Sequence, residues 1–200
     1  MCPECWFGHA TLDDERHKTG LSIILPGPEN PFLSKPVAAA YVLNGFGKSL
    51  GLMQIQELGV LETPIALTNT LNVGLVHDAL VGYMIEQCQR DGIRLTSVNP
   101  VVCECNDATL NDIQKRDLGS AQLMAAIQDA QADFAEGDVG CGKGMVCHSL
   151  KGGVGSASRQ VEIDGHTYTI GVLVQSNHGS LKDLIIAGKP AGRIIDAALN

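Results

Sequence analysis

The chain has 200 residues, which is enough for one domain with a substantial core, and we expect residues 1–200 to form a single domain. Its formal net charge of −8 argues against nucleic acid or an anionic membrane as a partner. No apolar run is long enough to span a membrane, and Met1–Ala10 lacks the basic start and apolar stretch of a signal peptide, so we expect a cytoplasmic protein.

The composition also bears on assembly and on redox state. Charged residues are only 18% of the chain, below the usual quarter, and a surface with so little charge is often partly covered in an oligomer. The seven cysteines are an odd number in a chain without an export signal, so we expect reduced thiols. Most of them lie in apolar or glycine-rich surroundings, where cysteine behaves as a small hydrophobic residue.

The first third of the chain predicts mainly strands. Leu21–Pro26 reads as a strand that follows a charged turn at Asp13–Lys18. Val37–Phe46 could form a strand or a short helix, and Met53–Leu58 alternates between apolar and polar residues as a strand does. Pro64–Thr70 has the composition of a buried strand.

The middle of the chain predicts two helices. Apolar residues follow the helical period between Val73 and Gln89, and Thr70 or Asn72 could cap that helix. Asp91 and Gly92 end it. The other elements predicted here are a strand at Val98–Cys105 and a helix at Ala121–Ala132, with Ser120 as its cap.

The last part of the chain predicts β structure that stops on an apolar run. Gln160–Ile163 and Tyr168–Val174 are joined by Asp-Gly, a strong hairpin signal. A short strand is expected at Leu184–Ala187, and a second apolar run follows at Ile194–Leu199. We interpret this ending as a cut, or as the point where a second chain should begin. The order of elements is typical of an α+β fold in which helices cover the sheets.

The glycine-rich stretch Val139–Arg159 resembles a nucleotide loop only superficially. Lys143 is followed by Gly144 and a β-like run rather than by Ser or Thr at the start of a helix, and no βαβ unit surrounds the glycines. We therefore expect these glycines to permit tight turns and close backbone approach.

Polar residues follow two strands that look buried. Glu104 and Asn106 alternate onto one face at the end of the strand VVCEC, and an acid there is a good binder for an ammonium group. Asn177 and His178 follow the strand ending in VLVQ; an amide there could donate to an oxyanion, and the histidine could act as a base. In both cases an ordinary strand end with local hydrogen bonds is an alternative.

Cys2 and Cys5, with His9 close behind, could be half of a zinc site. No second pair of ligands follows at a suitable spacing, so we expect no metal ion, although a zinc-binding module stays open as a weaker hypothesis.

Several segments together resemble the L-aminopeptidase/D-esterase family, which includes the β-aminopeptidases. The resemblance runs in order from Phe7 to Ser180, and its segments are FGHATL, AAAYVLNGFGKSLGL, LGVLETPIALTNTLNVG, NPVVCECNDATLNDI, EGDVGCGKGMVCHSLKGGVGSASR and YTIGVLVQSNHGS.

The resemblance implies a self-processing hydrolase with an N-terminal nucleophile. Family precursors cut themselves before a serine or threonine, which becomes the first residue of a smaller chain. This chain would then be the α subunit, with Asn200 at the self-cleavage site. The implied fold is a four-layer αββα sandwich completed by the second (β) chain, assembled as (αβ)4 and needing no cofactor.

Carried over by position, Glu104 would hold the free amino group of the substrate and Asn177 would complete the oxyanion hole. Asn106 stands where some members carry a tyrosine beside the acid, and we treat it as a substrate-binding candidate. The implied activity is release of N-terminal residues from short peptides, amides or esters. Alternatives are an amidase for another small amide, such as a pantetheine-like compound or an ω-amino-acid oligomer, and a truncated, non-catalytic homologue.

Overall fold

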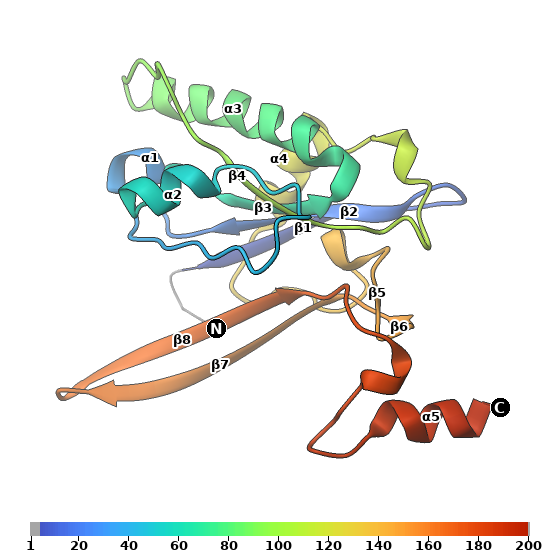
Figure 1. Cartoon of the computed structure of the whole chain (residues 1–200). Coiled ribbons are helices and arrows are strands. Elements are labelled where there is room, and N and C mark those ends of the chain that lie inside the picture. The colour runs from blue at the N-terminus through green and yellow to red at the C-terminus, as the bar shows by residue number, and fades with distance from the viewer. Residues whose placement is uncertain (1–4, 200) are drawn as a thin grey trace.

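A four-stranded sheet forms the centre of the molecule. The computed structural model describes residues 5–199, and Figure 1 shows the arrangement of their helices and strands. The strand order is β1-β2-β3-β4; β1 pairs with β2 and β2 with β3 antiparallel, whereas β3 and β4 are parallel. The strands are β1 (Trp6–Asp13), β2 (Lys18–Leu25), β3 (Ile65–Asn69) and β4 (Val101–Cys105).

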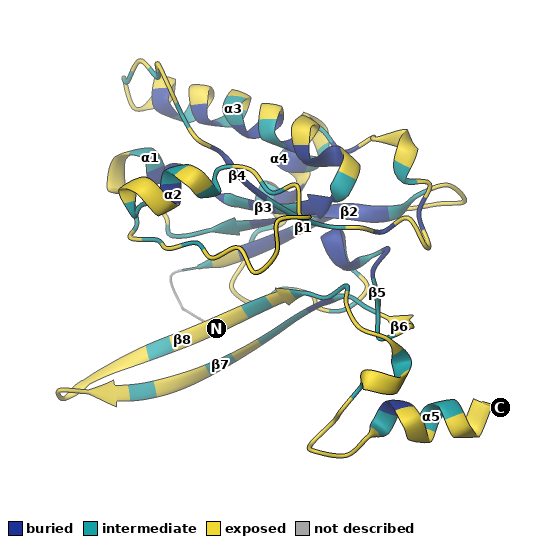
Figure 2. Cartoon of the chain, in the orientation of Figure 1, coloured by how far each residue is buried: buried dark blue, intermediate teal, exposed yellow. Residues whose placement is uncertain are grey.

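Two helices, α3 (Val73–Arg90) and α4 (Ser120–Asp129), cover one face of this sheet (Figure 1). The apolar positions of α3 recur at helical spacing and face the strands, so the main core lies between these two layers. Figure 2 shows the buried residues concentrated there. The largest fully buried side chains of this core include Leu21 and Ile23 of β2, Leu80 of α3 and Leu123 of α4.

A second, smaller core lies against the strands that carry Ile65, Val101 and Cys103. It contains Ile55 of the short helix α2 (Leu52–Leu58) together with Leu61. The other short helices are α1 (Pro31–Ser34) and 3-10 turns at Thr70–Asn72, Ile113–Lys115, Gly140–Gly142 and Leu181–Asp183.

A long hairpin projects from the body of the molecule (Figure 1). It consists of β7 (Val154–Ile163) and β8 (His166–Gln175), and its base is fixed to the central sheet by Gln175, whose Nε2 donates to the Thr68 carbonyl at 3.1 Å. Towards its tip it is largely exposed (Figure 2). Beside its base lie the two short strands β5 (Val146–Cys147) and β6 (Leu150–Lys151), and α5 (Ala191–Leu199) follows the hairpin.

Most of the predicted elements are confirmed. The strands at Leu21–Pro26 and Pro64–Thr70 correspond to β2 and β3, the two helices to α3 and α4, and the Asp-Gly turn joins β7 to β8. The strand predicted from Val98 begins only at Val101, after Pro100, which lacks the N–H that a ladder position requires. The first strand, β1, was not predicted from the sequence, although it pairs with β2 along its whole length.

Two predictions before β3 are wrong. Residues 37–46 form neither a strand nor a helix; Val37 makes only an isolated bridge to Val60, and most of the segment is exposed. Residues 53–58 belong to the helix α2, in which Ile55 is the one buried side chain, so the alternation there does not reflect a sheet face. Gly59, with φ +69°, ends that helix.

Two predictions near the C-terminus are also wrong. Residues 184–187 form no strand but lead into a turn in which Ala187 (φ +50°) and Gly188 (φ +76°) allow Ile186 to bridge Lys189. The apolar run 194–199 lies in α5, where its residues fall at helical rather than alternating spacing. Asn200 lies outside the described residues.

The helix caps agree with the predictions only in part. Asn72 occupies the N-cap position of α3, as predicted, but its side chain makes no capping hydrogen bond there. Asn69 accepts a hydrogen bond from the backbone N–H of Asn72 at 3.1 Å and so caps the 3-10 turn that leads into α3. Ser120 is the first residue of α4; the N-cap is Gly119, whose N–H donates to the Gln122 side chain at 3.0 Å.

The expected role of the glycine-rich stretch agrees with the structure. A Cβ atom on Gly144 would lie 2.0 Å from the Lys18 carbonyl oxygen, and one on Gly140 would lie 2.4 Å from the Ser22 hydroxyl. The 140–144 segment can therefore approach β2 only because these side chains are absent. Lys143 is held by ion pairs with Asp13 (2.6 Å) and Asp138 (2.7 Å).

Within residues 5–199, no helix combines the length and the apolar character that crossing a bilayer requires.

Candidate active site

Glu104 lies at the carboxyl end of β4, beside the point where the chain leaves β3. Because β3 and β4 are parallel and Thr68 is in register with Glu104, the segment after β3 passes next to the acid. The Thr70 hydroxyl donates a hydrogen bond to Glu104 Oε2, and the Lys48 backbone N–H donates to Oε1 at 3.0 Å. The carboxylate is thereby fixed from two sides by uncharged donors.

No Lys, Arg or His side chain among residues 5–199 forms an ion pair with Glu104. The nearest candidate by sequence, Lys48, directs its ammonium group elsewhere: Nζ donates to the Phe46 carbonyl at 2.6 Å and lies 3.6 Å from the centre of the Phe46 ring. The half-buried carboxylate therefore has acceptor capacity left for a cation that comes from outside this part of the chain.

An apolar cavity of about 460 Å³ lies next to Glu104. Two of its lining residues adjoin the acid: Cys103 precedes Glu104 in β4, and a Cβ built on Gly47 would lie 3.8 Å from Glu104 Oε1. The size and lining suit an amino-acid side chain held beside a polar anchor. Other lining residues are Ala40, Tyr41, Leu52 and Ile55.

The side chain of Asn106 takes part in a local turn. Its Oδ1 accepts a hydrogen bond from the Ala108 backbone N–H at 3.0 Å, which is a local turn interaction. Its backbone carbonyl accepts a hydrogen bond from the side-chain amide of Asn177. Asn106 and Asn177 are therefore hydrogen-bonded to each other, whereas the donors to Glu104 are Thr70 and Lys48.

Asn177 lies two residues beyond the end of β8, so the hairpin brings it to the end of β4. Its Nδ2 donates to the Asn106 carbonyl and has a long contact of 3.9 Å to Met145 Sδ. A side-chain amide donor thus lies close to the strand end that carries Glu104, and protein atoms accept its hydrogen bonds.

The thiols near this strand end are poorly suited to act as nucleophiles. Burial, together with the nearby Glu104 carboxylate, raises the pKa of the Cys105 thiol to about 11. Burial likewise raises the pKa of Cys103 and of Cys141. All three are neutral thiols at pH 7, whereas the reactive form of cysteine is the thiolate.

Asp107 is a structural residue of the site whose role the sequence did not reveal. It is buried, and its Oδ2 accepts hydrogen bonds from Thr19 Oγ1 (2.5 Å), Asn69 Nδ2 (3.1 Å) and Asn111 Nδ2 (3.2 Å). It thereby connects β2, the end of β3 and the turn after β4. The only sequence signal was its position two residues after the strand that delivers Glu104.

The structure groups possible metal ligands at a different place from the N-terminal cysteines and His9. Both ring nitrogens of His9 face protein groups, with Nδ1 2.7 Å from Ser22 Oγ and Nε2 3.0 Å from the Ala135 carbonyl, and burial lowers its pKa. Cys2 lies outside the described residues. The sequence assigned no role as ligands to Cys147, His148 and His178, yet their ligand atoms lie within 4.8 Å of one another.

The sequence of this chain is similar to a peptidase family and to known aminopeptidases. The model of peptidase family S58 matches residues 4–200. A β-peptidyl aminopeptidase BapA from Sphingosinicella xenopeptidilytica is 39% identical over 183 residues, which are 91% of this chain and 45% of that protein. The chain therefore spans less than half the length of this curated relative.

Solved structures that are similar to this chain in sequence and in fold point the same way. The PH0078 protein from Pyrococcus horikoshii OT3 matches with a TM-score of 0.92 and 45% identity, over 98% of this chain and 58% of that one. An L-aminopeptidase D-Ala-esterase/amidase from Ochrobactrum anthropi, described as a variant of the Ntn hydrolase fold, matches with a TM-score of 0.88 and 31% identity, over 97% and 56%. The mixed α and β structure described above is thus similar to the Ntn hydrolase fold.

Proposed function

This chain belongs to peptidase family S58, and on that premise we propose that it is the larger, α, chain of a self-processing aminopeptidase or amidase. The enzyme would release N-terminal residues from short peptides, amides or esters. Its nucleophile would be a serine or threonine at the start of a second, β, chain, freed when the precursor is cut after Asn200.

The observation that carries this proposal is the set of groups that surround the Glu104 carboxylate. A carboxylate fixed by the Thr70 hydroxyl and the Lys48 backbone N–H, without an ion-pair partner in the described chain, suits the free ammonium group of a substrate. Binding the ammonium there sets the distance between the amino terminus and the bond to be cleaved. The adjoining cavity would receive the side chain of the N-terminal residue.

Asn177 is the proposed side-chain donor of the oxyanion hole. As the substrate carbonyl is attacked, negative charge develops on its oxygen, and an amide N–H aimed at that oxygen stabilises the transition state. For this role the Asn177 amide must exchange its hydrogen bond to the Asn106 carbonyl for one to the substrate. Its position at the end of a hairpin fixed to β3 and β4 supports the role.

A nucleophile outside residues 5–199 is consistent with the raised pKa values of the thiols of Cys103, Cys105 and Cys141. In the proposed reaction, the hydroxyl of the first residue of the β chain attacks the carbonyl, and the amine or alcohol leaves. Water then hydrolyses the acyl-enzyme. The hydroxyl proton leaves with the amine or alcohol, and the water supplies the atoms that complete the hydrolysis.

Exposed apolar surface supports the proposed partner chain. On the hairpin, Tyr168, Ile170 and Val172 are each more than half exposed, and Ile194 of α5 is 62% exposed. A two-stranded hairpin is at best marginally stable alone, and exposed apolar surface of this extent marks contact sites. We propose that the β chain adds to this hairpin and completes an αββα sandwich, which assembles further as (αβ)4.

The proposal is tested with the full-length gene product. Amides of α- and β-amino acids with a free amino group are compared with the same amides after N-acetylation. We expect hydrolysis of free-amine substrates and strong discrimination against the acetylated ones. Equal rates for both sets would contradict the ammonium role of Glu104, and no hydrolysis of any amide or ester would favour the non-catalytic alternative.

A further inference from the structure

Three potential metal ligands from two separate segments meet beside the base of the hairpin. Cys147 ends β5, His148 begins the turn from β5 to β6, and His178 lies in the loop after β8. Their ligand atoms lie within 4.8 Å of one another, Cys147 Sγ is 3.7 Å from His178 Nδ1, and the two imidazole centres are 5.0 Å apart. We propose that these residues form a binding site for a divalent transition-metal ion of the zinc type.

The spacing suits a tetrahedral ion. Zinc bonds of about 2.3 Å to sulfur and about 2.0 Å to nitrogen place tetrahedral ligand atoms roughly 3.3–3.7 Å apart. The Cys147–His178 separation of 3.7 Å already has this value. Bringing the remaining ligand atoms to this spacing requires shifts of about 1 Å in exposed or half-exposed side chains. One thiolate and two imidazoles are also the ligand types that zinc, cobalt and copper ions prefer.

Hydrogen bonds join the two segments and orient the ring of His148. The His148 backbone N–H donates to the His178 carbonyl at 2.7 Å, which joins the two segments. His148 Nδ1 lies 3.0 Å from the Ser180 carbonyl, and because a carbonyl only accepts, Nδ1 carries the proton and Nε2 keeps a lone pair. Metal-binding histidines usually have such an outer hydrogen bond.

The turn between β5 and β6 sets the position of the His148 ring. His148 and Ser149 are its two central residues and adopt the positive φ angles, +51° and +60°, that a tight two-residue hairpin turn requires. The His148 ring lies over Gly179, where a Cβ atom would be 2.4 Å from the ring. The turn and the missing side chain together place the imidazole next to Cys147 and His178.

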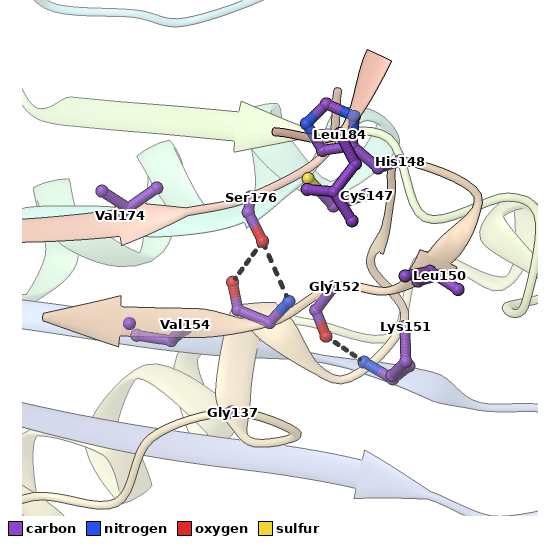
Figure 3. A pocket seen from close by; sticks show the side chains of 12 residues that line it. Gly137, Cys147, His148, Leu150, Lys151, Gly152, Val154, Val174, Ser176 and Leu184 are labelled. Atoms are coloured by element: carbon purple, nitrogen blue, oxygen red, sulfur yellow. Dashed lines mark hydrogen bonds between the residues drawn. The ribbon is translucent and has the colours of Figure 1, made fainter. Parts of the chain in front are cut away.

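The site opens onto a cavity, which leaves room for a fourth ligand. Cys147 and His148 line a cavity of about 440 Å³, and Figure 3 shows them gathered with Leu184 at one end of it. The nearby Lys151 ammonium is held by the Gly142 and Gly152 carbonyls and by an ion pair with Asp138 at 3.0 Å, so its charge is compensated. Three protein ligands and an accessible fourth position are the arrangement of an open zinc site.

The test uses the full-length protein, freed of metal, and titrates it with Co²⁺ and with Zn²⁺ against a chromophoric chelator. We expect one ion per chain and, with Co²⁺, a thiolate charge-transfer band together with intense visible bands of tetrahedral cobalt. Cys147→Ser should remove the charge-transfer band. His178→Gln, a substitution of an exposed side chain that should leave the fold intact, should weaken Zn²⁺ binding by at least about 10-fold.

The matched control is His166→Gln, which replaces an exposed histidine at the distant tip of the hairpin. It should bind both ions as the unaltered protein does. The proposal is overturned if the unaltered protein binds no ion above background, if its cobalt spectrum lacks the thiolate band, or if His166→Gln weakens binding as much as His178→Gln. Because the readout is metal binding, failure here leaves the proposed hydrolase function unaffected.

Discussion

The side-chain amide of Asn177 donates a hydrogen bond to the backbone carbonyl of Asn106, and this contact joins the end of β8 to the end of β4. The two residues are far apart in the sequence, yet the hairpin places the amide donor next to the strand that carries Glu104. The contact therefore brings the proposed oxyanion donor and the proposed ammonium anchor to one end of the central sheet.

We predict that Asn177→Ala lowers kcat of the full-length enzyme by about 100- to 1,000-fold, because loss of one oxyanion donor has this effect in other hydrolases. KM should change little, since the donor acts mainly on the transition state. Steady-state kinetics with a free-amine amide measure both constants. A loss confined to KM would instead assign Asn177 to substrate binding.

For Glu104→Gln we expect KM for free-amine substrates to rise roughly 10- to 100-fold, the range for a hydrogen bond to a charged group. The glutamine keeps the shape but loses the charge that attracts the ammonium. Self-cleavage of the precursor should be largely preserved. The matched control is Glu57→Gln, which neutralises an exposed acid on α2 and should leave KM unchanged. An equal loss on an ester without an amino group would contradict the ammonium role.

Asp107→Ala should destabilise the protein by roughly 3 kcal/mol, because three buried donors lose a charged acceptor at once. Denaturant unfolding of the full-length protein measures the change. Asp133→Ala, at an exposed position, is the control and should stay within about 0.5 kcal/mol of the unaltered protein. A similarly small change for Asp107→Ala would show that the buried carboxylate does not hold these segments together.

His17 should make stability depend on pH in a predictable direction. Hydrogen bonds from its ring to Asp14 and Asp117 raise the pKa of His17. The ion pairs therefore stabilise the fold fully below the unfolded-state pKa of about 6.5, and this stabilisation is lost as pH rises through the raised folded-state pKa. His17→Gln should be most destabilising at acidic pH in unfolding experiments. An effect that stays constant from acidic to alkaline pH would rule this origin out.

His9 should make the stability of the fold depend on pH in the opposite direction. Burial lowers its pKa, so the folded state favours the neutral ring, and stability should fall as pH drops from about 6.5 through the lowered folded-state pKa. Following both ring resonances by NMR during a pH titration separates the two histidines. A His9 midpoint at or above the ordinary value would contradict the assigned burial effect.

The fold could be predicted from the sequence where periodicity and burial agree. The helix at Val73–Arg90 and the Asp-Gly hairpin are such cases, since their side-chain spacing matches the surface that they cover. The pattern misled at Met53–Leu58 and Ile194–Leu199, two short helices of which only one face is in contact with the rest of the chain. Short apolar runs of this kind do not distinguish a strand from a helix.

The site was predicted less completely than the fold. The polar strand ends identified Glu104 and Asn177, but nothing in the spacing showed that Asn177 contacts the Asn106 carbonyl. The buried acceptor role of Asp107 and the meeting of Cys147 with His178 depend on contacts between distant segments. Such contacts become visible only once the strand order and the hairpin position are known.

The most direct test of the account is denaturing intact-mass analysis of the natively purified full-length gene product, combined with N-terminal sequencing. We predict two chains in a one-to-one ratio: a larger one that ends at Asn200, and a smaller one that begins with serine or threonine. An active enzyme that remains a single uncut chain, or a second chain that begins with any other residue, would contradict the proposed self-processed nucleophile.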